Sequence, residues 1–267
     1  MKRTEVVVRK EIKEILGNRG LVYSFLGLIL FFVLLPVALS AVIQASPANA
    51  KSDAQLNESI RQLMRLIPEL EEAPDQIRST VLVVRHFSII FLVLPVIGAL
   101  GSSTSSIVGE KQSRSIEPVL VTPVTSGELL FGKSLGTVVM AVSGTYLGFA
   151  LYVILIWAVA GPEVVRYGFD LTSLLMVGLL TPLIAILGLG SGVIISSRVK
   201  DSRTAQQVGG LIVLPIVFLI AGQISGLFLL GPGFVLVAAI ILIVLDVIVM
   251  RLGMRVFDRE RIISDWR

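Results

Sequence analysis

The chain has no cysteine and only one histidine, His86. Without cysteine, disulfide bonds, thiolate metal sites and cysteine nucleophiles are excluded. Charged residues are also scarce, at 16% of the chain against 54% hydrophobic residues. An average soluble domain carries about 25% charged residues, so this composition argues against a soluble globular protein.

What is abundant is long apolar sequence, arranged in six blocks close to or above the roughly 20 residues that a helix needs to cross a bilayer. The blocks are continuously apolar and lack the alternation of barrel strands, so we predict helices. We expect an all-α integral membrane protein with one domain over residues 21–250. Its predicted spans are 21–45, 87–108, 129–160, 171–195, 208–230 and 234–250, and Gly161-Pro162 and Gly231-Pro232 are predicted outer turns.

The first block is followed by Ala48-Asn49-Ala50, which mimics a signal-peptidase site. A cleaved signal peptide is therefore the alternative to a first span. Secretory hydrophobic regions are roughly 7–15 residues long, whereas this block has the length of a span and about 20 residues precede it. We predict that the first span is retained.

The basic residues predict the orientation. With the amino terminus inside, the inner segments hold 17 of the 23 Lys and Arg residues and the outer segments hold 6. The positive-inside rule therefore places both termini in the cytoplasm of a multi-pass cell-membrane protein. Topology accounts for the net charge of +4, so we expect no nucleic-acid partner.

Two segments have helical periodicity without the length of a span. Residues 1–20 predict an amphipathic helix on the inner membrane surface, with Val8, Ile12, Ile15 and Leu16 on its apolar face. Residues 53–67 predict a second amphipathic helix, in the outer loop. The cytoplasmic tail would be 251–267.

The loop at 109–128, between the second and third spans, is the most informative segment. Ser115 and Pro118 open a short helix that ends before Pro123, and Thr125 with Glu128 forms a capping box for the next helix. A short, stiff helix between two long helices can dock in a groove of a partner protein and transmit the motion of that partner to them.

This loop, Glu-Lys…Ile-Glu-Pro-Val-Leu-Val-Thr-Pro-Val-Thr…Glu-Leu-Leu…Gly-Lys, resembles that of ABC-2 type exporter permeases. The amino-terminal helix resembles the family's elbow helix, and Ser196–Arg203 and the Phe257–Arg261 tail are also similar to the family. The resemblance implies a permease that pairs with a second, identical or different, permease and with two ATP-binding cassette subunits. Those subunits would bind ATP and Mg²⁺, because this chain has no phosphate-binding loop motif and is expected to bind no cofactor or metal.

The resemblance also implies a coupling helix at about Ser115–Thr122. The alternative is an ordinary solvated loop whose charges only hold the topology. The residues expected to contact the cassette are Glu110, Lys111, Ser115, Ile116, Glu117, Pro118, Leu120, Thr122, Pro123, Glu128 and Lys133, and the second cytoplasmic loop offers Arg198, Lys200, Asp201 and Arg203.

Polar residues inside the spans have two interpretations. Asp246 could be an ion or proton site, but Arg251 lies close by and we expect the two to pair.

Arg85 and His86 are expected to anchor the outer start of the second span. The hydroxyl-rich run at 101–106 favours helix packing over a polar wall. Residues that could line a substrate path or a dimer seam are Ser102, Ser103, Ser106, Gln223 and Ser225.

The leading hypothesis is the non-enzymatic permease subunit of an ATP-driven exporter for a lipid-like or amphipathic substrate. A polytopic membrane enzyme would need facing acid–base groups, of which the spans offer chiefly Asp246. A secondary transporter would need paired discontinuous spans and ion coupling. A cassette-driven machine that transmits force without moving a solute is a further alternative.

Overall fold

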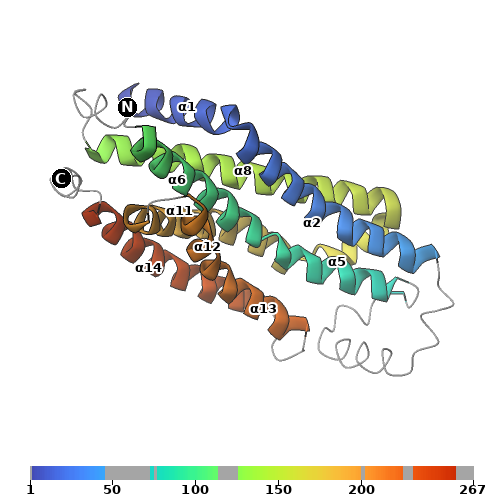
Figure 1. The fold of residues 1–267 in the computed structure, drawn as a ribbon. Helices are drawn as coiled ribbons and strands as arrows, with labels where there is room; N and C mark the ends of the chain where they lie inside the picture. The colour runs from blue at the N-terminus through green and yellow to red at the C-terminus, as the bar shows by residue number, and fades with distance from the viewer. Residues whose placement is uncertain are drawn as a thin grey trace.

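The computed structural model describes residues 2–45, 73–74, 77–113, 126–199, 202–224 and 231–256. Over these ranges the chain forms helices and no strand, and the long helices lie side by side in one bundle (Figure 1). Five segments are long and apolar enough to cross a membrane: Arg19–Ala45, Arg78–Thr104, Ser134–Ala160, Leu171–Ser196 and Pro232–Gly253. The prediction of an all-α, multi-pass membrane protein is therefore confirmed.

The count of six spans stays a prediction, because the fifth predicted span is only partly described. It comprises α12 (Ser202–Gly209), the 3₁₀ turn η3 (Gly210–Val213) and α13 (Leu214–Ile224). Its apolar part, Gln207–Gly222, is shorter than the five spanning segments. Residues 225–230, which would complete the span, lie outside the described ranges.

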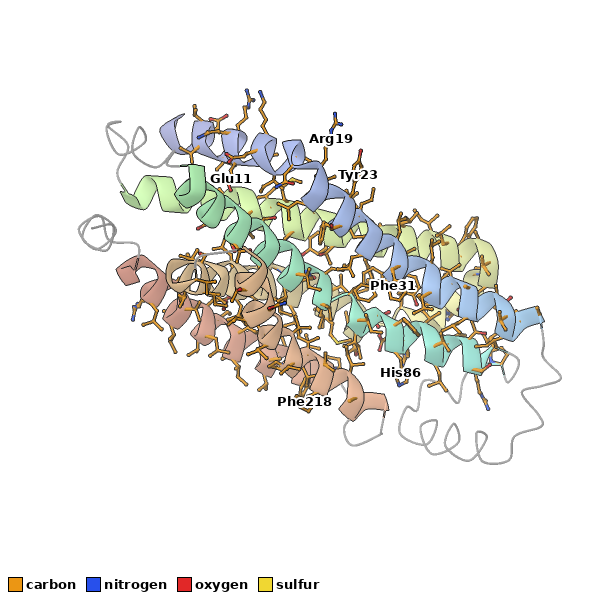
Figure 2. All side chains as sticks on the ribbon, in the orientation of Figure 1. Glu11, Arg19, Tyr23, Phe31, His86 and Phe218 are labelled. Carbon is orange, nitrogen blue, oxygen red and sulfur yellow. The ribbon has the colours of Figure 1, made fainter. Side chains whose placement is uncertain are left out.

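The amino-terminal helix α1 (Lys2–Gly17) meets α2 (Arg19–Ala45) at a corner formed by Asn18. The Asn18 Oδ1 atom accepts a hydrogen bond from the Leu21 backbone N–H at 3.2 Å and so caps α2. Figure 2 shows the exposed Arg19 pointing away from the bundle at this corner.

Helix α1 packs against α8 (Ser126–Ala160). Its buried side chains are Glu11 and Ile15, whereas Leu16 on the predicted apolar face is 53% exposed. A Cβ atom added at Gly136 of α8 would lie 3.0 Å from the Glu11 Cβ, so the missing side chain allows the close approach. The location of α1 on the membrane surface stays a prediction.

The second span consists of two helices, α5 (Arg78–Ile90) and α6 (Val93–Ser113), interrupted at Phe91 and Leu92. Pro95 provides the physical reason, because it has no N–H to donate to the Phe91 carbonyl. The Leu94 N–H donates to that oxygen instead, at 3.1 Å. The span begins nine residues earlier than predicted, at Arg78 rather than Phe87, so Arg85 and His86 lie within α5 and not at its outer start.

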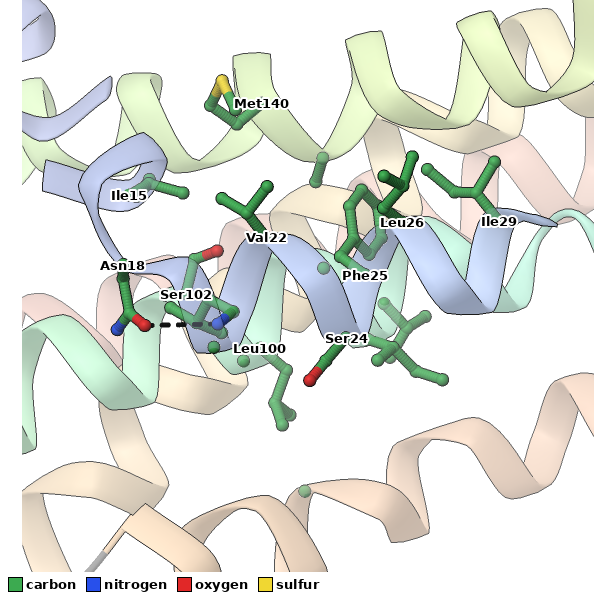
Figure 3. Close-up of a pocket in the computed structure, with 18 of the residues that line it drawn as sticks. Ile15, Asn18, Val22, Ser24, Phe25, Leu26, Ile29, Leu100, Ser102 and Met140 are labelled. Atoms are coloured by element: carbon green, nitrogen blue, oxygen red, sulfur yellow. Dashed lines mark hydrogen bonds between the residues drawn. The ribbon is translucent and has the colours of Figure 1, made fainter. Parts of the chain in front are cut away.

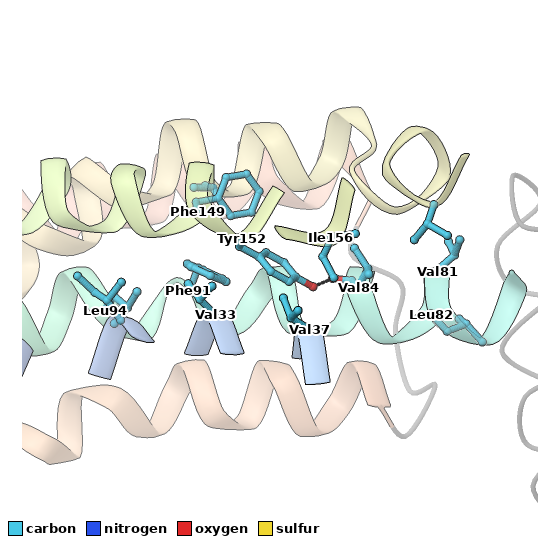
Figure 4. Close-up of a cluster of buried hydrophobic side chains, with 13 residues drawn as sticks. Val33, Val37, Val81, Leu82, Val84, Phe91, Leu94, Phe149, Tyr152 and Ile156 are labelled. Carbon is cyan, nitrogen blue, oxygen red and sulfur yellow. Dashed lines mark hydrogen bonds between the residues drawn. The ribbon is translucent and has the colours of Figure 1, made fainter. Parts of the chain in front are cut away.

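The half of the bundle that contains α5 has a core rich in aromatic side chains (Figure 4). The Phe91 and Tyr152 rings stack with centroids 5.2 Å apart, and Phe149 meets Phe91 edge-on at 5.4 Å. The buried Tyr152 hydroxyl donates to the Val84 carbonyl oxygen at 3.2 Å. The interruption in the second span is therefore enclosed by close packing from α8.

A short helix, α9 (Pro162–Gly168), connects the third span to α10 (Leu171–Leu175), the short helix that begins the fourth span. As predicted, Gly161-Pro162 forms the turn: Gly161 has a φ of 87°, which favours glycine, and Pro162 starts α9. Asp170 caps α10 by accepting the Ser173 backbone N–H at 2.9 Å and the Ser173 hydroxyl at 2.6 Å.

Asp170 also joins this connection to α5. Its Oδ2 lies 3.4 Å from Arg85 Nη2, and the two side chains are only 19% and 11% exposed. Arg85 Nε additionally donates to the Tyr167 carbonyl oxygen at 3.0 Å. We call these contacts the outer clamp, after the side of the membrane on which the sequence predicts this connection to lie. They explain how a charged residue is accommodated within a spanning segment.

We expect Asp170→Ala to destabilise the permease more than Asp170→Asn. Asparagine keeps a side-chain oxygen for the Ser173 N–H and removes only the ion pair with Arg85, whereas alanine also removes the cap, which alone contributes about 0.5–2 kcal/mol. Thermal unfolding of the detergent-solubilised permease measures the difference. Equal losses for the two variants would show that the cap adds nothing.

The fourth span is continuous from α10 through a π-helical segment, η2 (Met176–Leu180), into α11 (Thr181–Arg198). Tyr146 of α8 donates to the Gly178 carbonyl oxygen at 2.7 Å within this segment. Such π-helical segments often occur at functional positions. Here the altered helix geometry is stabilised by a side chain from the neighbouring span.

Helix α11 uses alternate glycines to approach two neighbours. A Cβ at Gly188 would lie 3.0 Å from the Val96 carbonyl oxygen of α6, and one at Gly192 would meet the side chain of Ser103, which is also on α6. Between them, a Cβ at Gly190 would lie 2.6 Å from Val249 Cγ1 of α14 (Pro232–Val256). Small residues four apart allow helix backbones to approach closely in membranes, and α11 is accordingly the centre of this half of the bundle.

Candidate functional site

The elements with predicted contacts to a partner lie at one end of the bundle. Helix α1, the carboxyl end of α6, the amino end of α8 and the carboxyl end of α14 all lie there (Figure 1). Helix α6 ends at Ser113 and α8 begins at Ser126, on either side of residues 114–125. We call the last nine residues of α6 and the first eight of α8, 105–113 and 126–133, the stem.

The stem flanks the segment that carries most of the predicted coupling residues. Glu110 and Lys111 lie on α6, and Glu128 and Lys133 lie on α8. The predicted coupling helix itself, Ser115–Thr122, lies outside the described ranges together with Pro123. Helix α8 begins directly after Thr125, the residue predicted to cap it.

The second predicted cytoplasmic loop is a short break between helices. Arg198 is the last residue of α11, and Arg203 lies in the first turn of α12. Lys200 and Asp201 are outside the described ranges. Since α12 contacts both α6 and α11, this break lies beside two helices of the glycine-rich packing described above.

A cavity of about 750 Å³ lies beside the corner between α1 and α2 (Figure 3). Its walls come from the corner itself, α2, α6, α8 and the α12–η3 junction, and we call it the corner cavity. Its volume is within the range of about 300–1,000 Å³ that is typical of small-molecule sites. Representative lining residues are Asn18, Ser24, Phe25, Ser102, Met140 and Gly210.

The corner cavity is apolar over most of its length. Asn18 and Ser102 lie close together at one end, and Ser24 adds a hydroxyl further along α2 (Figure 3). The opposite end is formed by side chains such as Phe25, Ile29 and Val96, and none of the described lining residues carries a charge. The cavity can therefore accommodate hydrocarbon along most of its length.

The structure separates the residues predicted for a path or a seam. Ser102 lines the corner cavity, whereas Ser103 is buried where α6 packs against Gly192 of α11. The Ser103 hydroxyl donates to the Leu100 carbonyl oxygen at 3.1 Å, within its own helix. Ser106 and Gln223 lie on α6 and α13, and Ser225 is outside the described ranges.

The expected pairing of Asp246 with Arg251 is wrong. Both carboxylate oxygens of Asp246 are buried without a hydrogen-bond partner among the described residues, and Arg251 is exposed. The two residues are five positions apart, roughly 140° around the helix, and so they face different directions. Asp246 lies in the buried stripe of α14, which also includes Val235, Ala239 and Gly253.

The corner cavity was missed in the sequence because its walls come from four segments that are distant along the chain, 15–29, 96–102, 140–141 and 209–213. A partial signal was present in glycines that interrupt apolar blocks, such as Gly101 and Gly210, which form part of its wall. A Cβ at Gly210 would have no neighbour within 4 Å, and one at Gly101 would meet only Leu21, at 3.7 Å. These glycines leave open space, unlike Gly188 and Gly192.

Comparison with known proteins connects the helical bundle to a family. No curated protein matches the chain. The family described as "ABC-2 family transporter protein" matches residues 6–234, from the first turns of α1 to the start of α14, including the segment between α6 and α8. Because this match covers far more than half of the sequence, the chain belongs to the ABC-2 transporter family, as a membrane permease of an ABC transporter.

Proposed function

We propose that the chain is the permease subunit of an ATP-driven exporter that contains a second permease and two ATP-binding cassette subunits. Both termini and the stem would lie on the cytoplasmic side. Support comes from the family, whose permeases typically work with ATP-binding subunits in a membrane complex. The excess of basic residues in the segments at this end supports the orientation.

The stem is the structural feature that most directly supports the proposed mechanism. Helix α6 ends and helix α8 begins on either side of the segment that holds the predicted coupling helix. A displacement of that helix by closing cassette subunits would pull directly on α6 and α8. Helix α1 would stabilise the base of the stem through its contact with Gly136.

The motion would pass from α6 to α11 through the close contacts at Gly188 and Gly192. Closely packed helices move together, since backbone contact leaves little room for one to slide past the other. At the other end of the second span, the outer clamp joins α5 to α10 through Arg85 and Asp170. The interruption at Phe91 and Leu92 would therefore serve as the hinge between a moving inner half and a held outer half.

Co-expression with a cassette subunit encoded beside this permease tests the proposal. We expect the two proteins to co-purify and the wild-type permease to stimulate ATP hydrolysis. The double variant Glu117→Lys, Thr122→Ala should lower this stimulation at least tenfold, because like charges brought together at an interface cost several kcal/mol and about 1.4 kcal/mol already corresponds to a factor of ten. The measurement is steady-state ATP hydrolysis in nanodiscs.

The matched control is Glu163→Lys, which reverses an exposed charge on α9 at the opposite end of the bundle. It should leave both co-purification and stimulation unchanged. Unaltered binding and hydrolysis in the Glu117→Lys, Thr122→Ala variant would contradict the assigned coupling role.

A further inference from the structure

The corner cavity has a shape that suits one hydrocarbon chain. Along α2 its lining runs from Asn18 to Ile29, a distance of about 16 Å at 1.5 Å per residue. One leaflet contributes half of the roughly 30 Å hydrocarbon core of a bilayer, or about 15 Å. The cavity therefore extends through the depth of one leaflet.

The cavity walls are polar at one end and apolar at the other. Asn18 and Ser102 mark the end at the corner, which lies at the membrane surface if α2 begins to span at Arg19. Phe25, Ile29 and Val96 mark the end near the middle of the membrane. This is the polarity of a lipid in a leaflet, with its headgroup at the surface and its chain toward the centre.

The cavity is open to the side at the depth of the hydrocarbon. Leu26 and Ile97 line it and are still 48% and 38% exposed. A molecule in the leaflet could therefore enter laterally without its chain passing through water. Entry of this kind keeps the apolar chain in an apolar environment throughout.

Charge at the mouth favours an anionic headgroup. The exposed Arg19 follows Asn18 directly, and the last turns of α1 present the exposed Lys10 and Lys13 on the same side of the membrane. Exposed Glu14 is the nearest acidic residue along the chain. Juxtamembrane cations attract anionic lipid by about 1 kcal/mol per residue.

We propose that the corner cavity is the cargo-loading site and that it receives one hydrocarbon chain of an anionic amphiphile from the inner leaflet. The proposal rests on the permease function and on the cytoplasmic orientation proposed above. The chain packs between α2 and α6, and the headgroup stays at the corner beside Arg19. A movement of α6 driven through the stem then changes the width of the occupied cavity.

Photo-crosslinking tests the site in the complex of permease and cassette subunits, reconstituted in nanodiscs. The probe is phosphatidylglycerol with a diazirine on one acyl chain, and peptide mapping locates the label. We expect label within residues 21–29 and 96–102. Gly101→Phe and Gly210→Phe, which fill the cavity from two different segments of its wall, should each lower the labelling about tenfold, equivalent to about two fewer buried methylene groups.

Gly27→Phe is the matched control, because Gly27 lies on α2 outside the lining and a Cβ there has no neighbour within 4 Å. It should leave the label unchanged. Arg19→Glu should lower labelling by the anionic probe and not by the same diazirine on phosphatidylcholine. Equal labelling of wild type and both cavity-filling variants would overturn the proposal.

A second copy of the permease is the competing occupant. Because the chain has no cysteine, Ser24→Cys introduces its only thiol. A disulfide between two copies would place the partner permease over the cavity and overturn lipid loading, whereas a Ser24→Cys variant that is labelled by the lipid and forms no disulfide between copies supports it. Co-purification with the cassette subunit and ATP hydrolysis are measured on the same samples, so that failure of the permease function can be told from failure of the lipid site. If wild-type permease neither co-purifies nor stimulates hydrolysis, the permease function is refuted. If it does both and no lipid label is found, only the lipid site is refuted.

Discussion

Gly188→Leu should prevent the permease from forming a stable bundle, and Gly188→Ala should already destabilise it by about 1–3 kcal/mol. A Cβ at this position would lie 3.0 Å from the carbonyl oxygen and 3.2 Å from the Cα of Val96. Both are backbone atoms, which cannot rotate away as a side chain can. The larger side chain would therefore force α6 away from α11.

The expected consequence is loss of the most extensive helix contact in the described structure. Separation of α6 and α11 would also remove the connection from the stem to the fourth span. The measurement is the fraction of detergent-solubilised permease that remains monodisperse during a temperature ramp, together with co-purification of the cassette subunit. Gly188→Leu should lower both.

Gly27→Leu is the control for the added side-chain volume and for the loss of a glycine within a span. A Cβ at Gly27 has no neighbour within 4 Å, so stability should stay near that of wild type. Wild-type stability in Gly188→Leu would contradict the close contact between α6 and α11. Loss of stability in both variants would show that leucine is harmful at any glycine in the spans, and would remove the special role of Gly188.

The approximate positions of most spans could be predicted because hydrocarbon imposes a length on every crossing helix. Five predicted spans correspond to long apolar helices of the structure. The second span was placed too late in the chain because Arg78, Arg85 and His86 lower the hydropathy of its first turns. The partner that accommodates Arg85 is Asp170, from a distant connection, which a linear pattern cannot reveal.

Parts of the candidate site could be predicted where neighbouring residues in the sequence determine the start or end of a helix. The helix that starts at Ser126 follows a capping sequence, and the break after Arg198 follows a polar run. The different roles of Ser102 and Ser103 could not be predicted. Adjacent residues on a helix point about 100° apart, so which one faces a cavity depends on how the helix is rotated against its neighbours.

The hydroxyl-rich run illustrates the same limit. Ser103 and Thr104 both donate to the Leu100 carbonyl oxygen, at 3.1 Å and 2.8 Å. Their polar groups are thus satisfied within α6, and the small size of Ser103 allows the close packing against Gly192 of α11. Composition alone permits either a polar wall or a packed seam, and only the neighbouring Gly192 distinguishes the two for Ser103.

Asp246→Leu should raise the stability of the isolated permease by about 1–3 kcal/mol, the cost of burying an unsatisfied polar group. Asp246 is 7% exposed, and neither of its carboxylate oxygens has a hydrogen-bond partner among the described residues. It lies in the packing stripe of α14 between Ala239 and Gly253, where leucine would add apolar contact. Separation of α14 from the bundle would let the carboxylate rehydrate toward the carboxyl end of the helix.

Thermal unfolding in detergent provides the first measurement, and Val247→Leu on the exposed face of α14 is the control, with an expected change near zero. ATP hydrolysis stimulated by the permease provides the second. A more stable variant with reduced stimulation would show that the carboxylate is retained for the transport cycle at a cost in stability, as functional residues commonly are. A less stable Asp246→Leu variant would contradict the prediction and would show that the carboxylate has a stabilising partner.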